Sequence, residues 1–145
     1  MSAIEEKASE LMVQIHEIMR RYRRRQRDFV KGADSDLNQR EIDTLLRLGP
    51  DGECTMSQLA EELVLSMSSA TMIVDKLVQK GIVSREHSSA DRRVVMIRLT
   101  AEGEQAFKAI YEDFKRIGRT MLESLNEDEQ DTLLSLYRKV ASKLE

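Results

Sequence analysis

The chain has 145 residues and a formal net charge of −3, with 41% hydrophobic side chains, six Gly and one Pro. This length and composition predict one folded, soluble and mainly helical domain with a core of its own. No apolar run is long enough to span a bilayer and the N-terminus lacks the pattern of a signal sequence, so we expect a cytoplasmic protein without a membrane partner. The single Cys54 excludes an internal disulfide and a zinc site built from cysteines.

Basic residues are concentrated in one stretch of the chain, which matters more than the total charge. Residues 20–40 carry eight basic and three acidic side chains, whereas the rest of the chain is acidic overall. The arginines of residues 20–27 fit an anion-binding surface, but they also fit a solvated helix face paired with Glu17 and Asp28. Charged helix faces are common, so the second interpretation is favoured.

Two amphipathic helices are predicted in the first third of the chain. Apolar residues recur every three or four positions from Ile4 to Tyr22, which predicts a long helix that continues to about Phe29. A loop over residues 31–36 separates it from a second helix over residues 37–48, which ends at a Gly-Pro-Asp-Gly turn.

A helix–turn–helix is predicted next. Thr55 and Gln58 have the spacing of a capping box, and the apolar residues around them predict a helix over residues 56–63. A short turn leads to a second helix over about residues 68–80, which ends at Gly81. One face of this second helix is too polar for a core and is formed by Ser68, Ser69, Thr71, Met72, Lys76 and Gln79.

A β-hairpin follows these helices. Two strand-like runs, Ile82–His87 and Val94–Thr100, flank a polar turn that places Arg92 and Arg93 at its tip. The side chains at such a tip stand clear of the body of the protein. Thr100 then has the position of an N-cap for a further helix.

The last third of the chain predicts two more amphipathic helices. Apolar residues from Phe107 to Leu122 have helical spacing, and Asn126 with Glu129 forms a second capping box. We expect the final helix to bury Leu133, Leu134, Tyr137, Val140, Ala141 and Leu144. Together with the first helix, these faces exceed what one copy of the helix–turn–helix can cover. They predict a two-fold homodimer, with a monomeric helical bundle as the less favoured alternative.

One pattern in the hairpin region is specific. The pattern D-x-R-x5-L-T-x-x-G is formed by Asp91, Arg93, Leu99, Thr100 and Gly103. With the helix–turn–helix before it, this pattern resembles the winged helix–turn–helix of the MarR family of bacterial transcription regulators. The resemblance implies a mainly α fold with a small β-wing, in a single domain over residues 1–145. The winged helix–turn–helix would occupy residues 37–100, flanked by dimerisation helices at residues 1–30 and 101–145.

The same resemblance implies a sequence-specific regulator of transcription that binds double-stranded DNA. It would be a repressor rather than an activator, bind a pseudo-palindromic operator as a homodimer, and be relieved by a small-molecule effector. The expected DNA-binding residues are Asn38, Gln39, Arg40, Ser66, Ser68, Ser69, Thr71, Met72, Lys76, Arg92 and Arg93. Capping preferences make Asn38, Gln39 and Arg40 an equally good N-terminal cap cluster. Met72 stands where many relatives carry Arg or Lys, which favours A·T contacts and DNA shape over guanine readout.

The two arginines of the wing have different expected roles. In the family likeness, Arg93 pairs with Asp91 and stiffens the wing tip, which leaves Arg92 free to enter the minor groove. The alternative is a salt bridge that stabilises the turn without contacting DNA. Two exposed arginines beside a reading helix favour phosphate contact.

Met19 and Tyr22, with the neighbouring arginines, are the candidate residues for a small anionic aromatic effector, although such residues are often plain core. The family likeness supports the effector, since many members release DNA when they bind phenolic or carboxylate ligands. Two other functions are alternatives: a helical protein–protein adaptor that does not bind DNA, and a redox-sensing regulator based on Cys54. The acidic neighbours of Cys54 favour a structural, partly buried thiol over a reactive one.

No catalytic residues, metal ligands or cofactors are expected. His16 and Glu17 begin a pattern found in zinc proteases, but Arg20 occupies the position of the second histidine and cannot bind a metal. His87 has no cluster of Cys, His or acidic residues near it in the sequence, and the chain has no glycine-rich phosphate loop or nucleophile elbow. The sequence therefore argues against an enzyme.

Overall fold

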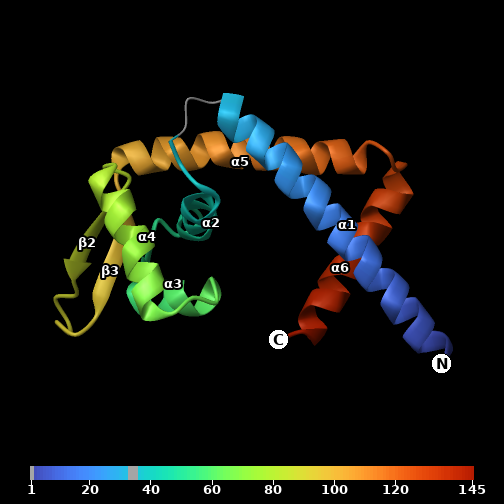
Figure 1. The fold of residues 1–145 in the computed structure, drawn as a ribbon, viewed down its shortest axis with the longest axis horizontal. Helices are drawn as coiled ribbons and strands as arrows, with labels where there is room; N and C mark the ends of the chain where they lie inside the picture. The colour runs from blue at the N-terminus through green and yellow to red at the C-terminus, as the bar shows by residue number, and fades with distance from the viewer. Residues whose placement is uncertain (1, 33–35) are drawn as a thin grey trace. The chain divides into compact units, whose positions relative to one another are not determined.

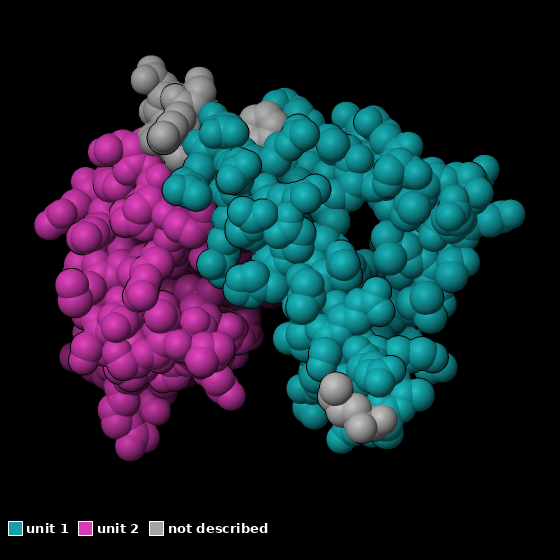
Figure 2. Space-filling model, turned by 45° about the vertical axis from the view of Figure 1, so that its right-hand side comes forward, with its two compact units in different colours: residues 1–29, 113–145 teal, residues 30–112 magenta. Residues whose placement is uncertain are grey.

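The computed structural model describes residues 2–32 and 36–145. Its elements, in chain order, are α1 (Ala3–Gly32), α2 (Gln39–Leu48), β1 (Glu53–Thr55), α3 (Met56–Glu62), α4 (Met67–Gln79), β2 (Val83–His87), β3 (Val95–Leu99), α5 (Ala101–Leu122) and α6 (Glu127–Lys143) (Figure 1). They form two compact units: unit 1 contains residues 1–29 and 113–145, and unit 2 contains residues 30–112 (Figure 2). The fold is mainly α with a small sheet, as the sequence predicts. No helix in the described ranges combines the length and the hydropathy needed to cross a membrane.

Local hydrogen bonds set two of the helix starts. Thr55 and Gln58 form the predicted capping box: Gln58 N donates to Thr55 Oγ1 at 3.0 Å, and Thr55 N donates to Gln58 Oε1 at 2.9 Å. Asn126 and Glu129 form the second predicted box at the start of α6. Each box satisfies backbone N–H groups that have no partner within the helix, which is why the helices begin at these residues.

Several helix boundaries differ slightly from the prediction, α2 among them, which begins at Gln39 rather than at residue 37. Helix α1 continues to Gly32, the first glycine of the chain, so the start of the predicted loop is helical, and residues 33–35 lie outside the described residues. Helix α4 begins one residue early, at Met67, because the Ser66 side chain accepts a hydrogen bond from Ser69 N and acts as the N-cap.

The sheet of unit 2 has three strands rather than the two predicted for the wing. Its order is β1-β3-β2, and both strand pairs are antiparallel. Strand β1 has three residues, and Cys54 at its centre lies opposite Ile97 of β3. A strand this short shows no alternating pattern, and it forms only by pairing with a strand far along the chain. The predicted two-stranded wing is present as β2 and β3, and β1 is a third strand that the sequence did not predict.

The core of unit 2 positions helix α4. Leu48 of α2, Leu77 of α4 and Ile97 of β3 belong to one buried cluster, each with an exposed fraction of 0%. The first turn of α5 closes the cluster at Gly103, which is buried against the backbone carbonyl of Ile82. Because one face of α4 is anchored in this core, the opposite face points to solvent.

Unit 1 leaves the apolar faces of its helices uncovered. No residue of α6, all of which is described, is buried, and Leu134, Tyr137 and Val140 are 42%, 48% and 50% exposed. The expected burial of this helix is therefore wrong for a single chain. Helix α1 exposes Leu11 and Met12 in the same way. These exposed side chains are accessible to a partner.

Candidate nucleic-acid interface

Helix α4 has the two faces that the sequence predicts. Val74 and Leu77 have exposed fractions of 0%, whereas Ser68, Met72 and Lys76 are exposed, Met72 by 63%. The buried face fixes the helix on the core of unit 2. The exposed face is therefore presented to solvent as a rigid surface of mixed polar and apolar character.

Most of the predicted hydroxyl contacts on α4 already have partners within the helix. Ser66 Oγ accepts from Ser69 N at 3.1 Å and donates to Ser69 Oγ at 3.0 Å. Thr71 Oγ1 donates to Met67 O at 2.7 Å. The Ser68 hydroxyl has no protein partner in the described part of the chain. Ser68 is thus free to donate and to accept, whereas Ser66 and Thr71 offer only acceptor lone pairs.

The start of α2 leaves one of its three predicted contacts unpaired. Asn38 is the N-cap: its Oδ1 accepts from Glu41 N at 3.0 Å, and its Nδ2 donates to Glu41 Oε1 at 2.8 Å. Gln39 Nε2 donates to Asp43 Oδ1 at 2.9 Å. Arg40 is exposed and has no side-chain partner among the described residues. The cap interpretation is confirmed for Asn38, and Arg40 remains as the charged group that can contact a phosphate.

The first turn of α2 lies beside the exposed side of α4. A cavity of about 170 Å³ separates them, and it is lined by Asn38, Arg40, Glu41, Ser69, Met72, Ile73 and Lys76. Arg40 and Lys76 therefore border the same space as Met72. Two elements that are separate in the sequence form one surface here.

A partly buried ion pair joins α2 to the end of α4, and it has no signal in the sequence. Glu41 has an exposed fraction of 1%, and its Oε2 lies 2.7 Å from Lys80 Nζ. The same Nζ donates to the carbonyl oxygen of Asp36 at 2.6 Å. Glu41 and Lys80 are 39 positions apart, so no local pattern indicates that they meet.

The wing tip contains the predicted pair of Asp91 and Arg93. Arg93 Nη2 lies 3.2 Å from Asp91 Oδ2, and Arg93 N donates to Asp91 Oδ1 at 3.0 Å. The side-chain hydrogen bonds from Arg93, and then the one from its backbone, hold the pKa of the Asp91 carboxyl below its ordinary value. The Arg92 side chain is exposed without a partner among the described residues, and only its carbonyl oxygen is engaged, at 2.8 Å from His87 Nδ1. Arg92 is therefore the free arginine of the tip.

Unpaired basic side chains distinguish this surface from the rest of unit 2. Within the described part of the unit, ion pairs engage Arg47, Lys80, Arg85, Arg93 and Arg98. Arg40, Lys76 and Arg92 form no ion pair there, and neither does Lys108 on α5. A free cation can neutralise a phosphate without first breaking an ion pair. Three of the four unpaired cations are predicted DNA contacts.

A second groove lies between the wing and helices α3 and α4. It has a volume of about 470 Å³ and is lined by Met56, Ser57, Met67, Thr71, Arg85, Glu86, His87, Arg93 and Val95. The sequence did not single out Ser57, Met67 or Arg85, and it raised His87 only as a candidate metal ligand. The available signal was the alternation of side chains along β2. It places Arg85 and His87 on the same face of the strand as the buried Val83.

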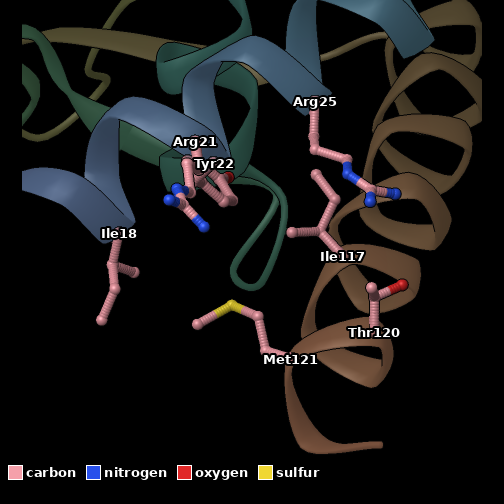
Figure 3. A pocket seen from close by; sticks show the side chains of 7 residues that line it. All are labelled: Ile18, Arg21, Tyr22, Arg25, Ile117, Thr120 and Met121. Carbon is pink, nitrogen blue, oxygen red and sulfur yellow. The ribbon is translucent and has the colours of Figure 1, made fainter. Parts of the chain in front are cut away.

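A cavity of about 260 Å³ within unit 1 contains one of the two predicted effector residues. It is lined by Ile18, Arg21, Tyr22, Arg25, Ile117, Thr120 and Met121, from α1 and α5 (Figure 3). The Tyr22 ring packs edge-on against Phe114, with ring centroids 6.2 Å apart. Met19 does not line this cavity and is 49% exposed. Arg21 Nε lies 2.6 Å from Glu17 Oε1, as the solvated-face interpretation of the arginine run predicts.

Cys54 has the environment of a structural thiol. Its exposed fraction is 4%, and burial raises the pKa of the thiol. Redox sensing needs the opposite properties, namely an accessible sulfur and a lowered pKa. The geometry therefore disfavours a redox sensor based on Cys54.

Comparisons with known sequences find a family and several relatives that this chain resembles. The MarR family model matches residues 37–95. The HTH-type transcriptional repressor MdtR of Bacillus subtilis is 30% identical over 72% of this chain and 68% of its own length. The HTH-type transcriptional regulator MhqR of the same organism is 30% identical over 72% of each chain. The uncharacterized regulator YfiV, also from this organism, is 31% identical over 68% of this chain, which spans only 61% of the length of YfiV.

Solved structures share the fold. A MarR family protein from Bacillus stearothermophilus matches with a TM-score of 0.85 at 24% identity, covering 97% of this chain and 96% of that one. A mutant of E. coli MarR, solved in complex with operator DNA, matches with a TM-score of 0.76 at 23% identity, covering 96% of this chain and 99% of that one. At these identities the likeness shows the fold alone.

Proposed function

Because this chain belongs to the MarR family of transcriptional regulators, we propose that it binds a pseudo-palindromic DNA operator sequence-specifically as a homodimer. The observation that carries the proposal is that Arg40, Lys76 and Arg92, each without an ion-pair partner among the described residues, lie on the unit that exposes α4, with Arg40 and Lys76 bordering one cavity. Two similar proteins support it: MdtR is a transcriptional repressor, and a mutant of E. coli MarR was solved in complex with operator DNA. We propose a cytoplasmic repressor that is relieved by a small effector.

In the proposed complex, α4 enters the major groove and the wing reaches the adjacent minor groove or backbone. Ser68 would hydrogen-bond to base edges, and the Met72 methyl group would contact thymine methyl groups. Helix α4, all of which is described, contains no arginine, so its only basic side chain for reading guanine is Lys76. Sequence preference would then rest on A·T contacts and on DNA shape, which Arg92 reads through the width of the minor groove.

Arg92→Ala is expected to weaken binding to all DNA sequences and to reduce the slope of log affinity against log salt concentration by about one. The reason is that Arg92 is exposed and unpaired, so its loss removes one phosphate contact. Arg93→Ala should weaken binding as well, because it removes the partner of Asp91 that stiffens the tip. Gel shifts over a range of salt concentrations, with the DNA upstream of the protein's own gene, measure both effects.

Lys108→Ala is the matched control for the wing variants. It removes the same charge from an exposed, unpaired residue of α5 outside the proposed contacts, so the salt dependence should not change. A wild-type slope for Arg92→Ala would contradict the assignment of the wing. If the wild-type chain shifts no duplex at any salt concentration, the protein–protein adaptor becomes the better account.

We further propose that a small anionic aromatic molecule binds in the cavity of unit 1. Tyr22 offers an aromatic face and Arg25 offers positive charge at the edge of the cavity, whereas Arg21 is paired with Glu17 (Figure 3). Such a ligand releases DNA if it binds the DNA-free arrangement of the dimer more tightly than the bound one. Salicylate is expected to release the operator from the wild type and not from Tyr22→Ala, as measured by gel-shift titration.

Met19→Ala is the control for this titration, because Met19 lies on the same helix but does not line the cavity. It should respond to salicylate like the wild type. An equal response from Tyr22→Ala would place the ligand elsewhere. Complete indifference of the wild type to salicylate-like compounds would remove this class of effector from the proposal.

A further inference from the structure

Glu41 is a carboxylate with almost no solvent contact, and both of its oxygens have directed partners. Oε1 accepts from Asn38 Nδ2 at 2.8 Å, and Oε2 lies 2.7 Å from Lys80 Nζ. The Lys80 side chain keeps 29% of its exposure, so the pair is only partly buried. Such a pair adds little net stability, because removing the Glu41 carboxylate from water costs about as much as the attraction returns. An apolar pair of similar volume would fill the space equally well. What the ion pair adds is a fixed direction and distance between two helices.

Lys80 extends the pair into a connection between three segments. It is the C-cap residue of α4, and its Nζ donates to the carbonyl oxygen of Asp36 at 2.6 Å as well as to Glu41. Asp36 and Glu41 lie on either side of the N-cap of α2. One ammonium group therefore ties the opening of α2 to the C-cap of α4.

We infer that Glu41 and Lys80 are positioning residues for DNA binding, a latch that holds Arg40 in register with the exposed face of α4. Arg40 precedes Glu41 in the first turn of α2 and borders the same cavity as Met72 and Lys76. A duplex presents its phosphates and its groove at a fixed spacing. Contacts from two elements therefore add only when those elements keep a fixed offset. The inference rests on the DNA binding proposed above.

The test is a double-mutant cycle between the latch and Arg40. The unlatched protein carries Glu41→Met and Lys80→Met, which replace the ion pair with apolar side chains. The probe is a duplex that the full-length wild type selects from a random-sequence library. Arg40→Ala should weaken binding about tenfold in the latched protein and less than about twofold in the unlatched one. A purely structural pair would change the melting temperature and leave the two effects of Arg40→Ala equal.

Arg92→Ala on the wing is the matched control, since Arg92 lies outside the latch. Its effect should be the same in both backgrounds. Equal effects of Arg40→Ala in the two backgrounds, or an Arg92 effect that also disappears, would overturn the latch and leave the proposed DNA binding intact. A wild type that selects no duplex would refute the proposed function itself. If the double variant does not fold, Glu41→Gln combined with Lys80→Gln gives the same comparison, because it removes both charges and keeps a polar side chain at each position.

Discussion

A chain that carries Leu136→Glu and Val140→Glu is expected to be monomeric at micromolar concentrations at which the wild type is a dimer. Both residues lie on one face of α6 and are about half exposed in the single chain, by 54% and 50%. A two-fold interface buries each substitution twice. At about 1 kcal/mol or more for each buried carboxylate, the affinity of the dimer should fall about a thousandfold. Light scattering measures the mass of both proteins.

Ser135→Glu combined with Ser142→Glu is the control for this result. These substitutions add the same charge to the same helix at exposed positions that point away from Leu136 and Val140. The control should remain a dimer. A wild type that is monomeric at micromolar concentration would contradict the homodimer, and a variant that stays dimeric would place the interface outside α6.

Gly103→Ala is expected to destabilise the protein by about 2 kcal/mol or more, although alanine is the better helix former. A Cβ at this position would overlap the carbonyl oxygen of Ile82. That carbonyl is held in place because it accepts a hydrogen bond from Thr100 N at 3.1 Å. Urea unfolding followed by circular dichroism measures the change in the free energy of unfolding.

Gly118→Ala is the matched substitution in the same helix. A Cβ at Gly118 meets no atom within 4 Å, so the change should raise the free energy of unfolding by up to about 1 kcal/mol. A loss of unfolding free energy at Gly103 and a gain at Gly118 would show that the last glycine of the pattern D-x-R-x5-L-T-x-x-G is needed because two backbones approach closely there. If Gly103→Ala is as well tolerated as Gly118→Ala, that explanation fails.

The helix starts and the wing tip could be predicted from the sequence because their hydrogen bonds are local. Thr55 and Gln58 are three residues apart, and Asp91 and Arg93 are two apart, so neighbouring residues bring donor and acceptor together without the rest of the fold. The exposed face of α4 follows from helical spacing in the same way. The family resemblance depends on these local patterns.

The start of α2 shows where local patterns stop being decisive. A helix N-terminus favours the same polar residue types whether they cap the helix or contact a phosphate. The structure separates the two roles, because both polar atoms of Asn38 bond to Glu41 while Arg40 stays exposed. Residue type alone carries no information on that division.

Contacts between distant segments were decided only by the tertiary structure. The pairing of Glu41 with Lys80 and the placement of Cys54 opposite Ile97 each close a long loop. The entropy cost of closing such a loop is offset only when the whole core forms, so the residues next to each partner carry no signal of it. For helix α6, too, local spacing decides only part of the structure. It predicts an apolar face, but it does not indicate which surface covers that face. Among the described residues nothing buries this face, and in the proposed homodimer a second copy of the chain would cover it.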